Sequence, residues 1–366
     1  MKIIVQKNLF ADAIQKLTSI ISSRTTLPIL NNVLIIAEND MLTLETTDLD
    51  IRITTKIPAT IDKTGSTTVP AKRLLMFIRD FQGDKITLET DNSFNLKIES
   101  GESSYRLLGI SPEEFPPAIP VMSVRKITIP QKDLQRHLSF VSYSTSPDET
   151  RKILNGVLLS VKSNIFITVA TDGKRLALME KPIDKFEGSD GDVVIHSRVA
   201  NELQRIIPKE DGIATIEVGE KMIKFEFAGT ILLSKIMEGT FPNYRQVIPT
   251  SFSKKFELNR ESFYSCIRRI MNVISESNPA VTFTFFNDKI TLTANSTDVG
   301  EGKESIPVEY KGPEFKFMLN PNNIMDSMKV MTVDKFILQM NDGFSPVGIF
   351  GDEGFLYIMM PVRTNK

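Results

Sequence analysis

The chain has 366 residues, a length that predicts two to three domains. Its 44 Lys and Arg residues nearly balance its 45 Asp and Glu residues, so the overall charge indicates neither a polyanion nor a membrane surface as partner. No stretch approaches the ~18 apolar residues of a membrane span, and MKIIVQKNLF at the N-terminus lacks a signal-peptide core, so we expect a cytoplasmic protein.

The first third of the chain predicts strands and two helices in a fixed succession. KIIV, from Lys2 to Val5, leads into a helix that begins at Lys7, where apolar residues recur with a period of 3.6 at Leu9, Phe10, Ala13, Ile14 and Leu17. VLIIAENDMLTLE then alternates apolar and polar residues around Asn39-Asp40, which is the pattern of a hairpin. TTVPAKRLLMFI runs from a strand into a second helix, and KITLETDNSFNLKIES with SYRLLGI predicts further strands.

This succession recurs twice more along the chain. KIIV returns as KITI from Lys126 to Ile129 and as KFEL from Lys255 to Leu258. The hairpins return around Ser163-Asn164 and Asn287-Asp288, and the strand-to-helix junction at Pro70 returns at His196 and Asn320. Repeats of this length are tandem domains, since a solenoid has a period of ~20 to 50 residues.

The repeats predict three domains, at residues 1–122, 123–250 and 251–366, with boundaries in the proline clusters at 112–120 and 242–249. Each domain holds a helix followed by about four antiparallel strands, twice over. We therefore expect an α+β fold in which two helices of each domain pack on two antiparallel sheets. Short proline-rich connections are semi-rigid, so the three domains should form a fixed arc.

The charges of the six predicted helices differ from those of the rest of the chain. The helices carry thirteen Lys or Arg residues and six Asp or Glu residues, a net +7, so the remaining residues sum to −8. A basic helical side would attract a polyanion such as nucleic acid, although Lys and Arg are also simply good helix formers. The chain has no zinc-finger, basic-zipper or RNA-recognition signature, so contacts should be to phosphate and independent of base sequence.

Motifs for catalysis are absent from the sequence. Neither GxxxxGK[ST] nor GxGxxG occurs, and we expect His137, His196 and a buried Cys266 to be structural. Asp48 with Asp50, or Asp352 with Glu353, could hold Mg²⁺ in a nuclease, but their turn positions favour a solvated surface. We therefore expect no catalytic residue, no metal and no cofactor.

The ordered motifs RTTLPILNNVLI, TTDLDIRI, TTVPAK, ILNGVLL, TVATDGKRLAL, GTFPNYRQVIP and MMPVR closely resemble the bacterial sliding clamps, the beta subunits of DNA polymerase III. The resemblance covers the whole chain. It implies three tandem DNA-clamp domains that assemble, as a head-to-tail homodimer, into a ring around double-stranded DNA. It also implies a non-catalytic processivity factor whose partners are the replicative polymerase, the clamp loader and other proteins with a clamp-binding motif.

The resemblance implies an apolar cleft for a partner peptide, with Met and small apolar walls that accept Leu or Phe anchors. On sequence alone, a run like MMPV is more often part of an ordinary core, and only the resemblance favours a cleft. Lys174 departs from the His of well-known relatives, and three residues follow Arg363, so peptide preference could differ. The cleft residues are Leu154, Thr171, Gly173, Lys174, Arg175, Leu176, Pro242, Arg245, Val247, Pro346, Ile358, Met360, Pro361, Val362 and Arg363.

The resemblance also implies that domain 1 of one subunit meets domain 3 of the other. The interface candidates are Arg73, Tyr105, Leu107, Val273, Ile274, Asp298, Glu301 and Glu304, with Lys72 beside Arg73 and with Lys303 interrupting the acidic stretch. Ordinary core packing is the alternative for the apolar members. The expected phosphate contacts are Arg24, Lys72, Arg73, Arg79, Arg136, Arg151, Lys152, Arg198 and Arg205.

Three classes of function remain after the sequence is read. They are a ring-shaped processivity factor, a protein that grips DNA from one side, and a nuclease. The first accounts for the repeats, the basic helices and the motifs together.

Overall fold

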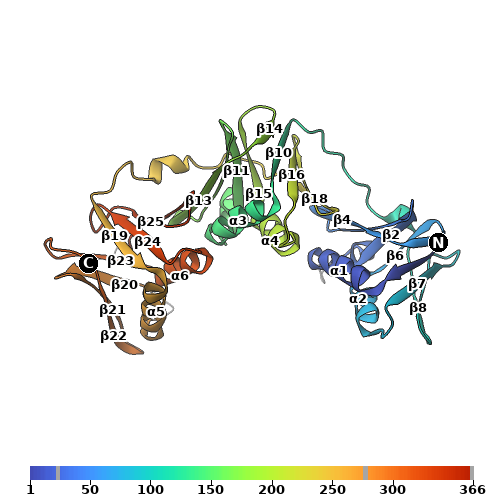
Figure 1. Ribbon diagram of the computed structural model, residues 1–366, viewed down its shortest axis with the longest axis horizontal. Helices are drawn as coiled ribbons and strands as arrows, with labels where there is room; N and C mark the ends of the chain where they lie inside the picture. Colours follow the sequence, from blue (N-terminus) through green and yellow to red (C-terminus); the bar gives the residue numbers. More distant parts are fainter. Residues whose placement is uncertain (22–24, 275–278, 363–366) are drawn as a thin grey trace. The chain divides into compact units, whose positions relative to one another are not determined.

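The computed structural model describes residues 1–21, 25–274 and 279–362 and divides into two compact units (Figure 1). Unit 1 comprises residues 1–135, 183–189 and 198–236, and unit 2 comprises residues 136–182, 190–197 and 237–366. The described residues hold six α-helices: α1 (Lys7–Leu17), α2 (Ala71–Asp80), α3 (Gln131–Val141), α4 (Ser197–Ile206), α5 (Arg260–Ile270) and α6 (Pro321–Val330). These are two helices for each predicted repeat.

Unit 1 contains two antiparallel sheets. The smaller has the order β5 (Thr60–Lys63), β1 (Lys2–Gln6), β7 (Lys85–Thr90), β8 (Leu96–Ser100) and β9 (Ser103–Leu107). The larger has the order β14 (Lys185–Glu187), β10 (Arg125–Pro130), β16 (Ile213–Val218), β17 (Met222–Phe227), β18 (Thr230–Lys235), β4 (Ile51–Pro58), β3 (Met41–Thr47), β2 (Asn32–Glu38) and β6 (Gly65–Pro70).

Unit 2 also contains two antiparallel sheets. The larger has the order β15 (Gly191–His196), β11 (Gly156–Lys162), β12 (Ile165–Thr171), β13 (Arg175–Pro182), β26 (Phe355–Met359), β25 (Val347–Phe350), β24 (Lys335–Met340) and β19 (Lys254–Asn259). The smaller has the order β22 (Gly300–Pro307), β21 (Lys289–Ser296), β20 (Val281–Phe286) and β23 (Phe315–Leu319).

The two large sheets join strands from successive repeats. In unit 1, β18 pairs with β4, so Leu232 lies opposite Ile53. In unit 2, β13 pairs with β26, so Leu176 lies opposite Ile358. The α+β class, the three tandem copies and the two antiparallel sheets for each copy are confirmed. The sequence did not reveal that neighbouring copies share a sheet. Each copy contributes a group of strands to each of two sheets, and backbone hydrogen bonds join neighbouring copies.

The hairpin turns lie where the alternation predicted them. Asn39 and Asp40 have φ of 50° and 57°, and the same left-handed pairs occur at Ser163-Asn164 and Asn287-Asp288. Asn, Asp and Ser accept this backbone region through local hydrogen bonds, and it matches the twist of paired strands. The three equivalent turns therefore fix the register of three equivalent hairpins.

The helices bury the apolar faces expected from their periodicity. α1 buries Phe10, Ala13, Ile14 and Leu17, while α2 buries Ala71, Leu74, Leu75 and Ile78. Each such large side chain contributes about 1.5–3 kcal/mol when it leaves water. α1 packs beside α2, and α5 beside α6 (Figure 1).

None of the helices in the described part of the chain is both long and apolar enough to cross a membrane.

Candidate functional site

The turn between β12 and β13 is held by its own side chains. Thr171 Oγ1 donates to the Arg175 carbonyl at 2.6 Å, and Asp172 Oδ1 accepts from the backbone N–H groups of Lys174 and Arg175 at 2.8 and 3.0 Å. Gly173 lies between them at φ +86°, a region that costs an L side chain strain. The turn therefore presents Gly173 and Lys174, both exposed, in one fixed conformation.

The guanidinium of Arg175 lies behind this turn and is only 11% exposed. It donates to Asp172 at 3.1 Å, to Asp326 of α6 at 2.7 Å and to the Tyr143 carbonyl at 2.6 Å. Burial alone lowers the pKa of Arg175, but Tyr357, Asp326 and Asp172 raise it overall. Because its donors are engaged within the chain, Arg175 supports the turn rather than presenting a free charge. Asp326 is a member of this site that the sequence did not identify.

The residues after β26 lie against the same turn. The backbone N–H of Met360 donates to the Lys174 carbonyl at 2.9 Å, and that of Val362 donates to the Met318 carbonyl at 2.8 Å. Met360 is 40% exposed, and Pro361 and Val362 are partly exposed. The structure therefore brings MMPV beside the ATDGKRL turn, as expected, although the motifs are far apart in sequence. Arg363 lies outside the described residues.

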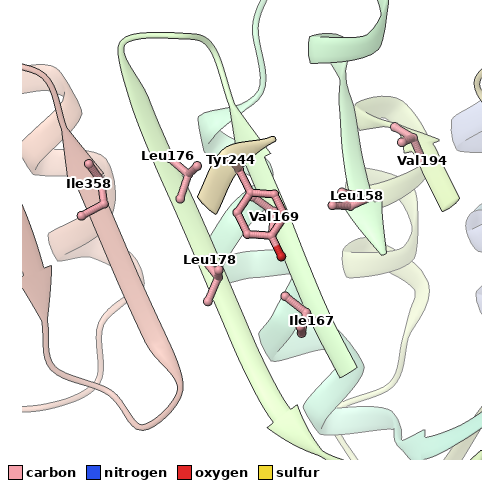
Figure 2. Close-up of a cluster of buried hydrophobic side chains, with 8 residues drawn as sticks. All are labelled: Leu158, Ile167, Val169, Leu176, Leu178, Val194, Tyr244 and Ile358. Carbon is pink, nitrogen blue, oxygen red and sulfur yellow. The ribbon is translucent and has the colours of Figure 1, made fainter. Parts of the chain in front are cut away.

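An apolar cluster forms the base of this region (Figure 2). Leu176 of β13 and Ile358 of β26 are opposite each other, and Tyr244, from the 3₁₀ turn η6 (Tyr244–Val247), packs with them. Val247 remains 47% exposed, and Pro242 and Arg245 are exposed. Leu154, Thr171 and Pro346 are partly exposed. Buried Leu and Ile with exposed Met, Val and Pro at the rim provide an apolar surface bordered by cations.

Two of the expected phosphate contacts are paired with carboxylates. Arg136 of α3 lies 2.7 Å from Asp352, whose side chain is 1% exposed, and Arg198 of α4 lies 2.5 Å from Asp48, 13% exposed. The expectation that Asp48 and Asp352 lie on a solvated surface is therefore wrong, because each closes an ion pair between adjacent repeats. Both arginines stay partly exposed, at 40% and 49% of their side chains.

The other expected phosphate contacts differ in how much charge they leave free. Lys72 and Arg73 of α2 are exposed and form no ion pair with the described residues. Arg79 donates to the Gln15 side chain at 2.9 Å, and Arg205 pairs with Glu202 at 2.5 Å. Arg151 lies 3.5 Å from Asp148, and Lys152 is exposed. Arg24 lies outside the described residues.

The interface candidates lie on or near two edge strands, β9 and β22, with Arg73 on α2 and with Val273 and Ile274 after α5. Tyr105 of β9 is 46% exposed, and its ring lies 4.6 Å from that of Phe77, a residue the sequence did not single out; Leu107 is buried. Val273 and Ile274 are partly exposed beside α5, while Asp298 and Glu301 are exposed. Glu304 instead receives two hydrogen bonds of 2.8 Å from Arg269, so its carboxylate is engaged within the chain.

The residues expected to be structural are confirmed as buried in two cases. His137 is fully buried beside Thr168, with Nδ1 3.2 Å from the hydroxyl, and Cys266 is 6% exposed, which raises the pKa of its thiol. His196 is exposed at the end of β15. The described residues contain no group of three or more His, Cys, Asp or Glu side chains arranged to hold a metal ion.

Comparison with known proteins shows the same organisation. Models of the DNA polymerase III beta subunit match the N-terminal domain at residues 1–120, the central domain at 128–243 and the C-terminal domain at 245–363. The beta sliding clamp of Chlamydia muridarum is 31% identical over the full length of both chains, and that of Chlamydia pneumoniae is 30% identical. The chain belongs to the bacterial sliding clamp family.

Solved structures of sliding clamps agree with this assignment. The Bacillus subtilis clamp superimposes with a TM-score of 0.94 at 26% identity, and both chains are fully covered. The Bartonella birtlesii clamp, solved bound to griselimycin, gives a TM-score of 0.93 at 29% identity with the same coverage. The family is that of the processivity factor of DNA polymerase III, a non-catalytic subunit.

Proposed function

We propose that two copies of this chain form a closed head-to-tail ring that encircles duplex DNA and tethers the replicative polymerase through the peptide cleft. The observation that carries the proposal concerns two edge strands, β9 and β22. Their equivalents in other repeats, β18 and β4, are hydrogen-bonded to each other within the chain. β9 is the last strand of its sheet and β22 the first strand of its own.

The strand orders establish this equivalence. β5-β1-β7-β8-β9 repeats as β14-β10-β16-β17-β18, and β6-β2-β3-β4 repeats as β23-β20-β21-β22. Within the chain, β18 pairs with β4. By analogy, the partner of β9 is the β22 of a second copy. Two such head-to-tail contacts, one at each end of the chain, would close two copies into a ring of six domains.

Side chains at the internal joint support the same pairing. Lys72 of α2 and Arg198 of α4 each stand two residues after the equivalent strand-to-helix junctions, Pro70 and His196, so Lys72 and its neighbour Arg73 occupy the position of Arg198. Arg198 binds Asp48 and donates to the Ile20 carbonyl at 3.1 Å, after α1. The equivalent of Ile20 is Val273, after α5. We therefore expect Arg73 of one copy to lie beside Asp298 of the other copy. We expect the Phe77–Tyr105 ring pair of the first copy to pack against Val273 and Ile274 of the second.

The helices supply the surface for DNA. They carry the thirteen cations and six acids counted in the sequence, and Lys72, Arg73 and Arg268 are exposed without an ion pair among described residues. We propose that they contact phosphates transiently, because such contacts carry no sequence information and weaken with salt. Arg136 and Arg198 contribute less, since each already has a carboxylate partner.

The peptide cleft is the proposed site for the polymerase, the clamp loader and other proteins with a clamp-binding motif. Its support is the exposed apolar rim of Met360 and Val247 over the Leu176–Ile358 base. We also propose that the chain binds griselimycin, as the Bartonella birtlesii clamp does. Met360→Ala should weaken a fluorescein-labelled peptide with Leu and Phe anchors by about tenfold, because an apolar anchor loses its contact. Unchanged anisotropy would count against the cleft.

Linearisation of a loaded plasmid tests the ring. A clamp loaded on a nicked circular plasmid should elute with the DNA and be released when a restriction enzyme cuts it, whereas retention would favour a one-sided grip. Tight equilibrium binding to short linear duplexes would favour the same alternative. Magnesium-dependent cleavage of labelled DNA would indicate a nuclease. The domain limits at 1–122, 123–250 and 251–366 and a cytoplasmic location remain part of the proposal.

A further inference from the structure

A pocket of about 360 Å³ adjoins the proposed peptide cleft on unit 2. Its wall comes from β13, β26 and the η6 turn, and includes Leu178, Glu180, Tyr244, Arg245, Ile248 and Leu356. Only Arg245 among these six belongs to the cleft residues implied by the family resemblance. The pocket therefore extends the cleft, because it shares Arg245 with the expected cleft residues and Tyr244 with the apolar base described above.

The pocket continues the face of the sheet that forms the base of the cleft. Leu176 lies opposite Ile358, and two residues farther along the strands Leu178 lies opposite Leu356. Because alternate residues of a strand share a face, both pairs point to the same side. Figure 2 shows Leu176, Leu178 and Tyr244 gathered on this side of β13. A peptide that follows the strands out of the cleft reaches Leu178 and Leu356 next.

Tyr244 provides an independent indication of a ligand. Its side chain lines the pocket and is 8% exposed, yet its hydroxyl is buried and has no hydrogen-bond partner among the described residues. A buried hydroxyl without a partner loses its hydrogen bonds to water and gains nothing in return. A backbone carbonyl or N–H of a bound chain would satisfy it, because a phenol hydroxyl both donates and accepts.

The charged side chains at the pocket have no carboxylate or cationic partner among the described residues, although the Arg245 guanidinium lies over the Tyr244 ring, 5.6 Å from its centroid. Glu180 and Arg245 are both exposed. The backbone N–H of Glu180 donates to the Gly354 carbonyl at 2.9 Å, which fixes the backbone of Glu180 two residues beyond Leu178. A basic side chain that follows an apolar one along a docked peptide would meet the Glu180 carboxylate.

We propose that this pocket binds the continuation of the partner peptide beyond the cleft. It takes an apolar side chain against Leu178 and Leu356, a backbone group at the Tyr244 hydroxyl and a Lys or Arg side chain at Glu180. The inference rests on the proposed peptide-binding function and adds a preference for the residues that flank the anchors. Partners with an apolar-basic flank should therefore bind more tightly than partners without one.

Fluorescence anisotropy with the purified full chain tests this. The probes are a labelled peptide with Leu and Phe anchors, the same peptide extended by Ile-Lys at either end, and matching extensions with Ile-Glu. One Ile-Lys extension should bind about threefold to tenfold more tightly than the short peptide, as expected for one or two added polar contacts with apolar burial. The Ile-Glu extension should gain less.

Variants assign the gain to the pocket. Glu180→Gln removes the charge and should reduce the gain while leaving the short peptide unchanged. Tyr244→Phe keeps the ring and removes the hydroxyl. Because Tyr244 also packs at the base of the cleft, its effect is read from the ratio of the two affinities, and the extended peptide should lose more than the short one. Glu353→Gln, an exposed glutamate on the nearby β25–β26 turn, is the matched control and should change neither. An extension that adds no affinity, or a gain that persists in both variants, would overturn the proposal. Failure of the short peptide itself to bind would instead refute the cleft.

Discussion

The guanidinium of Arg136 lies 2.7 Å from Asp352 Oδ1, and this single pair ties the helix of one repeat to the β25–β26 turn of the next. The other oxygen of Asp352 accepts the Thr332 N–H at 2.9 Å, and the Thr332 hydroxyl also donates to the carboxylate. The Arg136 guanidinium stacks 5.1 Å from the centroid of Phe140. A buried carboxylate with every partner in place is expected to be costly to disrupt.

Asp352→Asn should therefore lower the free energy of unfolding by about 1–3 kcal/mol, discounted because Arg136 is partly exposed and keeps contact with water. The measurement is the thermal unfolding midpoint by differential scanning fluorimetry. Glu353→Gln, its exposed neighbour, should leave the midpoint within experimental error. Equal midpoints for both variants would show that the Arg136–Asp352 pair contributes no net stability.

Arg175 and Asp326 should act as one unit in peptide binding. Asp326→Ala removes the acceptor 2.7 Å from Arg175 without touching the cleft surface, so the turn from Thr171 to Arg175 loses its anchor on α6. We expect either Asp326→Ala or Arg175→Ala to weaken peptide binding by about tenfold, and the double variant to be little worse, with a coupling of about 1–2 kcal/mol. Lys329→Ala, which removes a cation 3.8 Å from Asp326, is the control. If the losses of peptide affinity in the two single variants add up in the double variant, the two residues act independently.

Much of the fold was predictable because the same sequence pattern occurs three times in the chain. The left-handed pairs at Asn39-Asp40 and Asn287-Asp288 and the apolar face of α1 are local, so periodicity and turn chemistry suffice to predict them. The joining of β18 to β4 was not predictable, because the pattern of an edge strand does not say which distant edge it pairs with.

The site was predicted unevenly for the same reason. Resemblance placed Lys174 and Met360 together, and the structure joins them by a backbone hydrogen bond of 2.9 Å. Asp352 was misjudged because a turn position in sequence does not reveal that an arginine of another repeat covers it. Tyr244 and Phe77 were missed because an isolated aromatic residue carries no pattern until its neighbours are known.

The dimer interface should depend on Arg73 and Asp298 as a matched pair. Arg73→Asp places a like charge opposite Asp298 in the proposed contact, so the dimer dissociation constant should rise about tenfold or more. Combining it with Asp298→Arg should restore much of the affinity, since the attraction is reversed rather than lost. Sedimentation equilibrium measures both, and Lys329→Asp, an exposed helical cation elsewhere, is the control. If Arg73→Asp weakens the dimer and the added Asp298→Arg does not restore its affinity, Arg73 does not face Asp298 in the interface.

Glu304 should give the small sheet of unit 2 a measurable pH dependence. Two hydrogen bonds from Arg269 lower the pKa of this carboxyl below its ordinary value of 4.5. The folded chain therefore binds a proton at Glu304 less readily than the unfolded chain does. The stabilisation is fully present above pH 4.5 and is lost as the pH falls through the lower, folded pKa.

Glu304→Gln should consequently unfold at a lower temperature than the parent chain at pH 7, with the difference shrinking as the pH falls below 4.5. The measurement is the unfolding midpoint of both proteins from pH 7 down to about pH 2, which spans the pH range of the loss. It is made at low and high salt, because Arg269 and Glu304 are partly exposed and salt screens them. Glu301→Gln, on the same strand and without an ion pair among described residues, should follow the parent curve. A midpoint difference for Glu304→Gln that stays constant with pH would mean that the variant acts through its contact with Cys266 rather than through its charge.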